Sequence, residues 1–418
     1  MNFAEIIKEY RDRELLTQEQ LADILGVAFV SVNRWENGHF EPTPKVKKHL
    51  LELYYGNKIP TPNLEDIGIK TCEINNRRYL GNKYKLLNFI RTVVNENCPN
   101  IESFADIFAG TGSVSSAFND YKVITNDILY SNYLSNVAWF SSQSFRKDLV
   151  INLLKYFNSI EVNEVNYMSE NFSNTYFSAN DCSKIGYIRQ FIEDKYNNKE
   201  INERERAILV SSLIYAMDHI ANTCGHYDAY IKHSDFSKSL ELCYPNVPEN
   251  NNKNNMCFNM DANELVKNLN VDLVYIDPPY NSRQYCDTYH LLENVARWNK
   301  PEVYGVAKKM NRDNLKSDYC TKKAKSAFQD LINNISSKYI LVSYNNMGTK
   351  GNDRSNAKIS DEDIIEILNK KGKVTVFSQN YRAFSTGKSK IEDNQERLFL
   401  CKCKGVNNDW ISFKLHWR

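Results

Sequence analysis

The residues with the clearest chemical potential are four consecutive positions in the segment VDLVYIDPPYNSRQY, namely Asp277, Pro278, Pro279 and Tyr280. The apolar run at 271–276 before them predicts a buried strand in the middle of a parallel sheet. Because successive prolines cannot extend a strand, they fix the directions of the carboxylate, the carbonyl groups and the aromatic ring. This arrangement suits a planar amino-substituted base, whose exocyclic amine donates to the carboxylate and a carbonyl while the tyrosine stacks on its ring. Those hydrogen bonds would ease attack of the nitrogen on a methyl group; the alternative is a proline-terminated strand without a chemical role.

A second group of residues predicts a nucleotide-like ligand. The segment SFADIFAGTGSVSSAF contains a short apolar strand, then Gly110 and Gly112, then the start of a helix. Glycines let a ligand approach the backbone and a helix N-terminus offers free N–H groups, although alone this pattern indicates a βα turn without a ligand. The next expected strand, YKVITNDI, ends in Asp127, where an open α/β sheet binds ribose hydroxyls. Together these features favour an adenosine-containing cofactor, either a dinucleotide or S-adenosylmethionine, whereas the absence of the pattern GxxxxGKS/T disfavours ATP.

These motifs resemble those of the Dam-type (class alpha) adenine-specific DNA methyltransferases, through FAGTG at 108–112 and DPPY at 277–280. The resemblance covers residues 77–404 and keeps the family's order, with cofactor motifs first, a variable region next and DPPY last. It implies a Rossmann-like α/β sheet and S-adenosyl-L-methionine as the cofactor. RNA- and protein-methylating relatives tend toward NPPY and amino-cytosine enzymes toward SPPY, so Asp277 favours adenine in DNA.

The resemblance also implies roles for individual side chains. Tyr79 and Lys83 lie in RRYLGNKYKLL, which is similar to the family's leading motif and would pack over the methionine part of the cofactor. Asp261 falls where the family holds the amino group of the cofactor adenine, and capping a surface helix is an equal alternative. The full set of implied cofactor contacts is Tyr79, Lys83, Asp106, Phe108, Gly110, Gly112, Asp127, Asp261 and Asp277. The implied catalytic group is Asp277, Pro278, Pro279 and Tyr280.

Three more strands are expected at 339–346, 373–381 and 397–404, and the last two resemble the antiparallel hairpin that closes the methyltransferase sheet. Tyr381 and Phe384, in NYRAFS, fall where the family keeps an aromatic side chain that sandwiches an extruded base. Core packing is the alternative for both aromatic residues.

Residues 141–255 lack the alternating strand pattern and include helical stretches such as ERERAILVSSLIYAMDHIAN. This largely helical insertion resembles the family's target-recognition region, so residues 77–418 as a whole are predicted to form the methyltransferase domain. A second candidate for DNA contact is the basic stretch at 300–325, whose eight basic and three acidic residues suit DNA phosphates. Four single residues are candidate DNA contacts, for each of which a packed or solvated side chain is the simpler alternative: His226, Tyr230, Lys232 and Arg283.

Residues 1–56 predict a separate small all-α domain, followed by a proline-containing linker at 57–76. Thr17 followed by Gln20 is a capping-box pattern that begins one helix, and Gly26 supplies the turn to a second. Two short helices joined by such a turn resemble the Cro/repressor-type helix-turn-helix, which presents its second helix to the major groove.

That second helix departs from the resemblance in one respect. Its groove-facing first positions, often polar in the family, are Phe29 and Val30. The candidates for hydrogen bonds to base edges are therefore Ser31, Asn33 and Arg34. A helical packing module without a DNA role is the alternative.

The composition of the chain, 418 residues with 42% hydrophobic and 25% charged, fits a globular protein of more than one domain. The net charge of +2 conceals a basic segment, because 300–418 holds 23 basic and 13 acidic residues while the rest holds 30 and 38. No apolar run approaches a membrane span, and the charged N-terminus excludes a secretory signal. Ten cysteines without a CxxC pair predict reduced thiols in the cytoplasm rather than a zinc site.

These features predict a cytoplasmic enzyme that transfers the methyl group of S-adenosyl-L-methionine to N6 of an adenine flipped out of a specific duplex DNA site. No metal is expected, because a sulfonium leaving group is already activated. The expected partners are double-stranded DNA and a cognate restriction endonuclease encoded nearby, with no membrane, and the helix-turn-helix would regulate the operon or add DNA affinity. Two alternatives stay open: an RNA adenine methyltransferase, and a transcription regulator whose methyltransferase-like body only senses cofactor.

Overall fold

The computed structural model describes residues 2–14, 16–54, 64, 68–232, 235–345, 358–380 and 395–404. The chain divides into two compact units, Met1–Gly68 (unit 1) and Ile69–Arg418 (unit 2). The boundary falls inside the predicted linker, since residues 69–76 belong to unit 2. Within the described ranges, no helix is both long enough and apolar enough to cross a bilayer.

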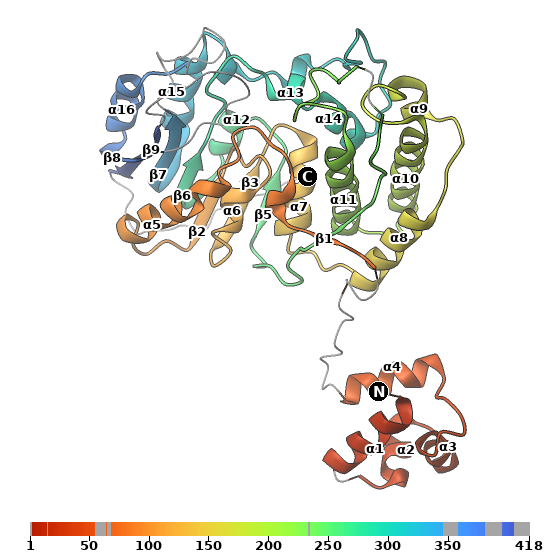
Figure 1. The fold of residues 1–418 in the computed structure, drawn as a ribbon. Helices are drawn as coiled ribbons and strands as arrows, with labels where there is room; N and C mark the ends of the chain where they lie inside the picture. The colour runs from red at the N-terminus through yellow and green to blue at the C-terminus, as the bar shows by residue number, and fades with distance from the viewer. Residues whose placement is uncertain are drawn as a thin grey trace. The chain divides into compact units, whose positions relative to one another are not determined.

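The described part of unit 1 contains four helices: α1 Phe3–Glu14, α2 Gln18–Leu25, α3 Phe29–Glu36 and α4 Pro44–Tyr54 (Figure 1). The predicted capping box is confirmed, because Thr17 Oγ1 accepts a hydrogen bond from Gln20 N–H at 3.1 Å. Gly26 ends α2 in the left-handed region at φ 64°, which turns the chain into α3. One fully buried aliphatic residue from each helix contributes to the core: Ile7, Leu21, Val32 and Leu50.

The described part of unit 2 is organised around a seven-stranded sheet in the order β5-β3-β2-β6-β7-β9-β8. Its strands are β2 Ser103–Asp106, β3 Lys122–Asn126, β5 Met256–Phe258, β6 Asn270–Ile276, β7 Ser336–Asn345, β8 Gly372–Asn380 and β9 Gln395–Cys403. Neighbouring strands are parallel except for β9, which is antiparallel to both β7 and β8. The predicted α/β class and the closing hairpin are therefore confirmed.

Both faces of the sheet are buried, as the apolar run of β6 predicts. Leu273 and Tyr275 pack on one face with α5, while Val274 and Ile276 pack on the other. The helices that cover the faces are α5 Leu87–Asn97 and α6 Ser113–Ser116 on the first, and α12 Ala262–Val266, α15 Ala324–Asn334 and α16 Asp361–Asn369 on the second.

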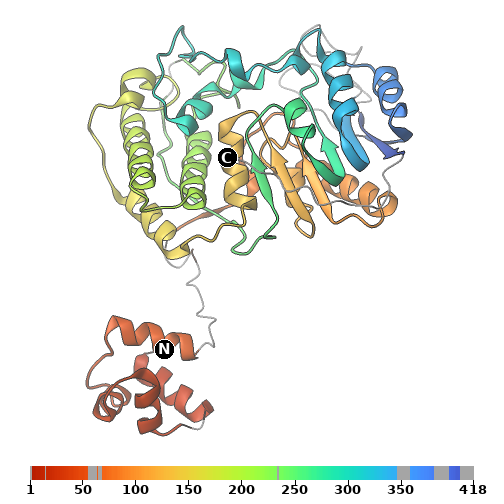
Figure 2. The ribbon, with the colours of Figure 1, turned by 180° about the vertical axis from the view of Figure 1, so that it is seen from behind.

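A group of helices stands beside the β5 edge of the sheet rather than on its faces, as Figures 1 and 2 show. The first of them, α7 Tyr130–Phe140, packs against β3 and β5 and also against α11. The helices of the predicted insertion are α8 Lys147–Ser159, α9 Tyr167–Phe172, α10 Ala179–Asn197 and α11 Glu203–Ile220. Two later helices, α13 Tyr285–Thr288 and α14 His290–Arg297, return to this group, and 3-10 turns lie at Ile74–Asn76, Tyr84–Leu86, Asp313–Leu315 and Asp318–Cys320.

The expectation that all ten cysteines are reduced is wrong for one pair. Strand β1 Thr71–Cys72 pairs in parallel with β4 Tyr244–Pro245, and this pairing brings Cys72 beside Cys243. The two form a disulfide with a Cα–Cα distance of 5.8 Å. Their spacing along the sequence could not reveal this contact, because it depends on a two-residue ladder between distant segments.

Candidate active site

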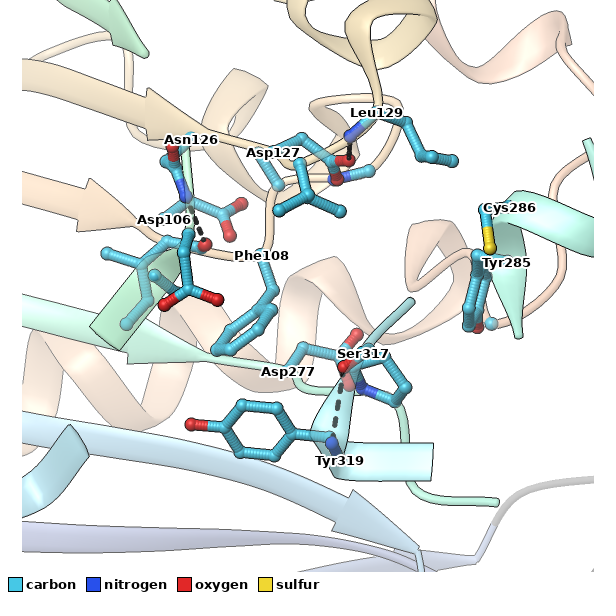
Figure 3. Close-up of a pocket in the computed structure, with 18 of the residues that line it drawn as sticks. Asp106, Phe108, Asn126, Asp127, Leu129, Asp277, Tyr285, Cys286, Ser317 and Tyr319 are labelled. Carbon is cyan, nitrogen blue, oxygen red and sulfur yellow. Dashed lines mark hydrogen bonds between the residues drawn. The ribbon is translucent and has the colours of Figure 1, made fainter. Parts of the chain in front are cut away.

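The carboxyl ends of the three central parallel strands open into a cavity of about 500 Å³ (Figure 3). Asp106 is the last residue of β2, and Asp127 and Asp277 directly follow β3 and β6. Carboxyl ends of parallel strands lie at one edge of the sheet, so three motifs far apart in the sequence contribute carboxylates to one cavity.

Steric crowding fixes the loop between β2 and α6. Gly110 and Gly112 have φ values of 54° and 85°, which residues with side chains rarely adopt. A Cβ atom on Gly112 would lie 2.5 Å from Asn136 Oδ1 and 2.7 Å from Phe140 Cε2. On Gly110 it would lie 3.1 Å from Tyr79 Cε1. Both glycines therefore serve close packing of the loop against its surroundings.

Asp127 fastens this loop to the next strand. Its Oδ2 accepts a hydrogen bond from Gly110 N–H at 2.9 Å, and its Oδ1 accepts one from Leu129 N–H at 2.8 Å. Burial raises the pKa of Asp127 to about 6, against the opposing effect of these hydrogen bonds. Both carboxylate oxygens are thus already bonded to backbone groups.

Three stacked tyrosines lie at another side of the cavity, and two of them, Tyr79 and Tyr285, line it. The Tyr79 ring stacks on Tyr289 with centroids 4.7 Å apart and planes inclined by 13°, and Tyr285 lies 5.4 Å away. The Tyr79 hydroxyl accepts a hydrogen bond from Asn132 Nδ2 at 2.9 Å. The Tyr289 hydroxyl accepts one from Leu80 N–H at 2.7 Å, which joins α14 to the segment before Lys83. The wall is therefore rigid and aromatic.

Asp106 is a buried carboxylate with spare acceptor capacity. Its Oδ2 accepts a hydrogen bond from Ser115 Oγ at 3.0 Å, whereas its Oδ1 has no hydrogen-bond partner among the described residues. Burial raises the pKa of Asp106 to about 8, and Asp277 and Asp127 raise it further through like-charge repulsion. An unpaired buried carboxylate oxygen on a cavity wall is suited to a cationic or hydrogen-bond-donating ligand.

Asp277 belongs to a buried ion cluster of three residues. Lys83 Nζ lies 3.2 Å from Asp277 Oδ1 and 3.0 Å from Glu396 Oε1 on β9. Glu396 Oε1 in turn accepts a hydrogen bond from Ser343 Oγ on β7 at 2.8 Å. The lysine and the glutamate are only 5% and 3% exposed. Through Lys83, these contacts link the Asp277 carboxylate to β9 and β7 and so restrict its position.

The charges of the cluster are coupled. Burial acts to lower the pKa of Lys83, but the neighbouring Asp277 and Glu396 carboxylates raise it well above its usual value, so the lysine is a cation. Burial raises the pKa of Asp277 to about 7, with Lys83 opposing and Glu396 reinforcing the shift. The Asp277 carboxyl therefore changes charge near neutral pH.

Among family profiles, that of the D12 class N6 adenine-specific DNA methyltransferases matches residues 79–356, and a helix-turn-helix profile matches residues 7–50. The first match covers well over half of the chain. The chain belongs to the D12 class N6 adenine-specific DNA methyltransferase family. The predicted membership in the adenine-specific class is thereby confirmed, as is the helix-turn-helix, and the RNA alternative is not favoured.

Named relatives of this D12 protein are modification methylases. It is 40% identical over 348 residues to Modification methylase StsI of Streptococcus sanguinis, covering 78% of this chain and 52% of the relative. It is 33% identical over 344 residues to Type II methyltransferase M.FokI of Planomicrobium okeanokoites, covering 77% and 52%. With Type II methyltransferase M.NlaIII of Neisseria lactamica it is 32% identical over 331 residues, covering 76% and 95%. The chain thus spans about half the length of the first two relatives and nearly all of the third.

The D12 chain brings most of the predicted site residues together. Of the predicted cofactor residues, all but Gly112 line the cavity. Asp261 lines it while also capping α12, because its Oδ1 accepts hydrogen bonds from Asn263 N–H and Glu264 N–H at 2.8 and 3.3 Å. Of the predicted catalytic residues, Asp277 and Pro279 line the cavity, whereas Pro278 is buried beside it and the Tyr280 ring packs edge-on against Tyr344 at 5.6 Å.

None of the described unit 2 residues predicted to contact DNA is part of the cavity lining. His226 Nδ1 is 3.8 Å from Asp228 Oδ2, the Tyr230 ring meets Tyr176 edge-on at 5.5 Å, and Lys232 and Arg283 are exposed. In unit 1, Arg34 is exposed, Ser31 is half-buried, and Asn33 Nδ2 donates to Gln18 Oε1 at 3.0 Å. The predictions for Tyr381 and Phe384 fall outside the described residues.

Several residues of the site were missed from the sequence, and Glu396 is one of them. Another is Arg77, which is buried, donates from Nη1 to Asn132 Oδ1 at 2.9 Å, and lies 3.3 Å from Asp218 Oδ2 on α11. Asp218 Oδ1 also accepts a hydrogen bond from Tyr227 at 2.8 Å. These contacts tie the helical insertion to the tyrosine wall. No pattern in the sequence predicts these contacts. The one indication was a charged residue, Arg77, at the start of the segment RRYLGNKYKLL that contains the leading motif.

Proposed function

We propose that this chain transfers the methyl group of S-adenosyl-L-methionine to the N6 amino group of an adenine turned out of a specific duplex DNA site. It would act in the cytoplasm as the modification enzyme of a restriction system, beside a cognate endonuclease. Family membership and the names of the relatives support the DNA substrate and the system. The observation that carries the proposal is the buried Lys83–Asp277–Glu396 cluster opening, through Asp277, into the cavity between the strand ends.

The chemistry of the cavity fits this cofactor. Its volume of about 500 Å³ lies within the range of roughly 300–1,000 Å³ that is usual for small-molecule sites. The unpaired Oδ1 of Asp106 suits the cofactor's ammonium group, and the tyrosine wall at Tyr79 suits an apolar or cationic face. When bound, the cofactor supplies an electrophilic methyl group on a sulfonium centre. The residues proposed to hold it are Tyr79, Lys83, Asp106, Phe108, Gly110, Asp127, Asp261 and Asp277, and Gly112 would act indirectly by shaping the loop that carries Gly110.

The residues after β6 would hold the target base. The Asp277 carboxylate and the Pro278 carbonyl accept the two hydrogens of the adenine amine, which draws electron density toward the attacking nitrogen. Tyr280 stacks on the extruded base, and these contacts offset the few kcal/mol that unstacking costs. Lys83, itself held by Glu396, keeps the Asp277 carboxylate in place. After methylation the nitrogen loses a proton to solvent through that carboxylate.

DNA would be held by surfaces of both units. We propose the insertion at 141–255 as the target-recognition region and the basic stretch at 300–325 as a phosphate contact. Tyr381 and Phe384 remain predicted partners of the extruded base. The single residues proposed to contact DNA are Ser31, Asn33 and Arg34 in unit 1 and His226, Tyr230, Lys232 and Arg283 in unit 2.

Methylation mapping tests this proposal. DNA from cells that express the wild-type chain is sequenced by a single-molecule method that detects modified bases, beside DNA from cells that express Asp277→Asn. We expect methylated adenine within one short sequence for the wild type and none for the variant. A matched control is Asp120→Asn, which removes an exposed carboxylate that is not part of the cavity lining.

Modified adenine with both Asp277→Asn and the wild type would contradict the assignment of Asp277. Absence of modified adenine with the wild type would contradict the proposed activity itself. A repeat of the assay on structured RNA would then test the alternative substrate.

A further inference from the structure

The outward face of α3 in unit 1 is apolar where a helix-turn-helix meets DNA. Phe29 and Val30, the first two residues of α3, are 44% and 53% exposed. Arg34 lies one turn after Val30, and its guanidinium is 5.7 Å from the ring centroid of Phe40, which is 64% exposed. We call these four residues, Phe29, Val30, Arg34 and Phe40, the α3 patch.

The α3 patch is not needed for the core of unit 1. The opposite face of α3 already buries Val32 and Trp35 against α1, α2 and α4. Glu36, on the same buried side, forms an ion pair with Arg11 Nε at 2.5 Å. Exposed apolar side chains that contribute nothing to the core point to a ligand.

The position of the α3 patch limits what that ligand is. The helix-turn-helix profile spans residues 7–50, which makes α3 the second helix, and the first residues of that helix approach base edges in the major groove. Phenylalanine and valine side chains form no hydrogen bonds, so they contribute to readout only by contacting apolar groups. In unmodified DNA, the apolar group on a base edge in that groove is the C5-methyl group of thymine. An N6-methyl group on adenine adds another methyl group to the same groove.

Charge around the α3 patch favours DNA over a protein partner. Residues 29–50 contain four basic residues, Arg34, Lys45, Lys47 and Lys48, and two acidic ones, Glu36 and Glu41. Glu36 is buried and paired with Arg11, and Lys47 is paired with Glu41, so Arg34, Lys45 and Lys48 account for the excess positive charge of this segment. Residues 2–28 instead contain three basic and six acidic residues. The α3 patch itself carries one cation, Arg34, and no carboxylate, which suits contact with DNA phosphates.

We infer that the α3 patch reads methyl groups on base edges in the major groove, through Phe29 and Val30, with Arg34 supplying the accompanying phosphate or base contact. This inference rests on the proposed function only in taking duplex DNA as the ligand. It also gives unit 1 a means of distinguishing a methylated site from an unmethylated one.

The test uses the full chain and DNA probes that differ only in methyl groups. A random duplex library is selected on the wild-type chain and on the double variant Phe29→Ser/Val30→Ser, and the sequence enriched only by the wild type is kept. Its affinity is then measured by fluorescence anisotropy for three duplexes, containing thymine, uracil in place of thymine, or N6-methyladenine in place of adenine. Val165→Ser, a similar change at a site 77% exposed in unit 2, is the control.

We expect uracil to weaken binding of the wild type about tenfold, and the double variant to bind thymine and uracil duplexes equally. Weaker binding of the uracil duplex identifies thymine as the source of the methyl group. Tighter binding of the N6-methyladenine duplex identifies modified adenine as the source. Equal binding of all three duplexes by the wild type would overturn the inference. So would a change of oligomeric state in the double variant, measured by light scattering, with unchanged DNA binding, because the α3 patch would then be a protein interface.

Two readouts separate the possible failures. The melting curve of the double variant shows whether unit 1 still folds; if it does not, the single variants Phe29→Ser and Val30→Ser are measured in its place. Methyl transfer by the wild-type chain is scored on the same preparation, so loss of the proposed activity is distinguishable from failure of the α3 patch to read methyl groups.

Discussion

Asp127 and Asp277 occupy equivalent positions, each directly after a central strand, but their surroundings differ. The two oxygens of Asp127 accept hydrogen bonds from backbone N–H groups, one of Gly110 in the loop between β2 and α6 and one of Leu129 just after Asp127. Asp277 instead meets a buried lysine, which a second carboxylate holds in place. The first carboxylate holds the glycine loop at the wall of the cavity, whereas burial raises the pKa of the second to about 7. A carboxylate at a strand end can thus hold a loop in place or stay available for a reaction. Its hydrogen-bond and ion-pair partners determine which of these it does.

The largest effect is expected from Asp277→Asn. The amide keeps the shape of the side chain but loses the charge, and Lys83 retains Glu396 as a partner, so the fold should persist. We expect the single-turnover rate of methyl transfer to fall on the order of 10³-fold. Quenched-flow measurement with saturating cofactor checks this. If Asp277→Asn reduced the single-turnover rate less than Asp127→Asn does, Asp127 rather than Asp277 would be the residue that takes part in methyl transfer.

The glycine loop is expected to respond next, through packing. Gly112→Ala places a methyl group against Asn136 and Phe140 at a positive φ, which should cost about 1–3 kcal/mol of folding free energy. Denaturant unfolding measures it. Gly305→Ala is the matched control, because Gly305 has φ 69° and nothing lies within 4 Å of the position that a Cβ atom would take there. Equal losses in both variants would mean that backbone strain, not crowding, controls the loop.

Asp127→Asn tests directly whether the Asp127 carboxylate holds the glycine loop in place. The amide oxygen can accept one of the two backbone hydrogen bonds, but the amide nitrogen faces the other donor and leaves it unsatisfied. We expect a dissociation constant for S-adenosyl-L-methionine about tenfold higher, with a smaller change in the rate at saturating cofactor. Calorimetric titration beside single-turnover kinetics separates the two. A rate loss without an affinity loss would assign Asp127 to the chemistry instead.

The smallest effect, and the most specific, is expected from Glu396→Gln. Removing this negative charge takes away one cause of the raised pKa of Asp277 and leaves Lys83 to Asp277 alone, so both consequences lower the pKa. Because the ionised form of Asp277 is the proposed acceptor, methyl transfer by the wild type should rise as the pH passes about 7. In Glu396→Gln the same rise should occur at lower pH. If the rate of Glu396→Gln rose at the same pH as that of the wild type, Glu396 would have no electrostatic effect on Asp277.

The sequence was sufficient for the parts of the site that are local. DPPY and FAGTG each lie within a few residues at the end of a predicted strand, so the sequence alone predicted that Asp277 and Gly110 would lie at strand ends that border one cavity. Apolar runs likewise predicted the strands β2, β3, β6, β7, β8 and β9, and the family resemblance predicted that β8 and β9 form a hairpin. The capping box at Thr17 is another feature whose cause is entirely local.

The features that sequence reasoning missed are contacts between segments that are far apart in the sequence. Glu396 reaches Lys83 only because β9 inserts between β7 and β8, and Arg77 meets Asp218 only because α11 packs beside α7. The Cys72–Cys243 disulfide and the inclusion of residues 69–76 in unit 2 share one cause, the short β1–β4 ladder. Such contacts depend on tertiary pairing, which leaves no periodic pattern in either segment.

The central claim is tested most directly by identifying the product. The purified chain is incubated with duplex DNA and S-adenosyl-L-methionine that carries an isotopically labelled methyl group, and the DNA is digested to nucleosides for mass spectrometry. The account predicts label in N6-methyldeoxyadenosine with the wild type, and an initial rate of labelling on the order of 10³-fold lower with Asp277→Asn. Label in a methylated cytosine alone, or equal label in N6-methyldeoxyadenosine with the variant, would contradict it.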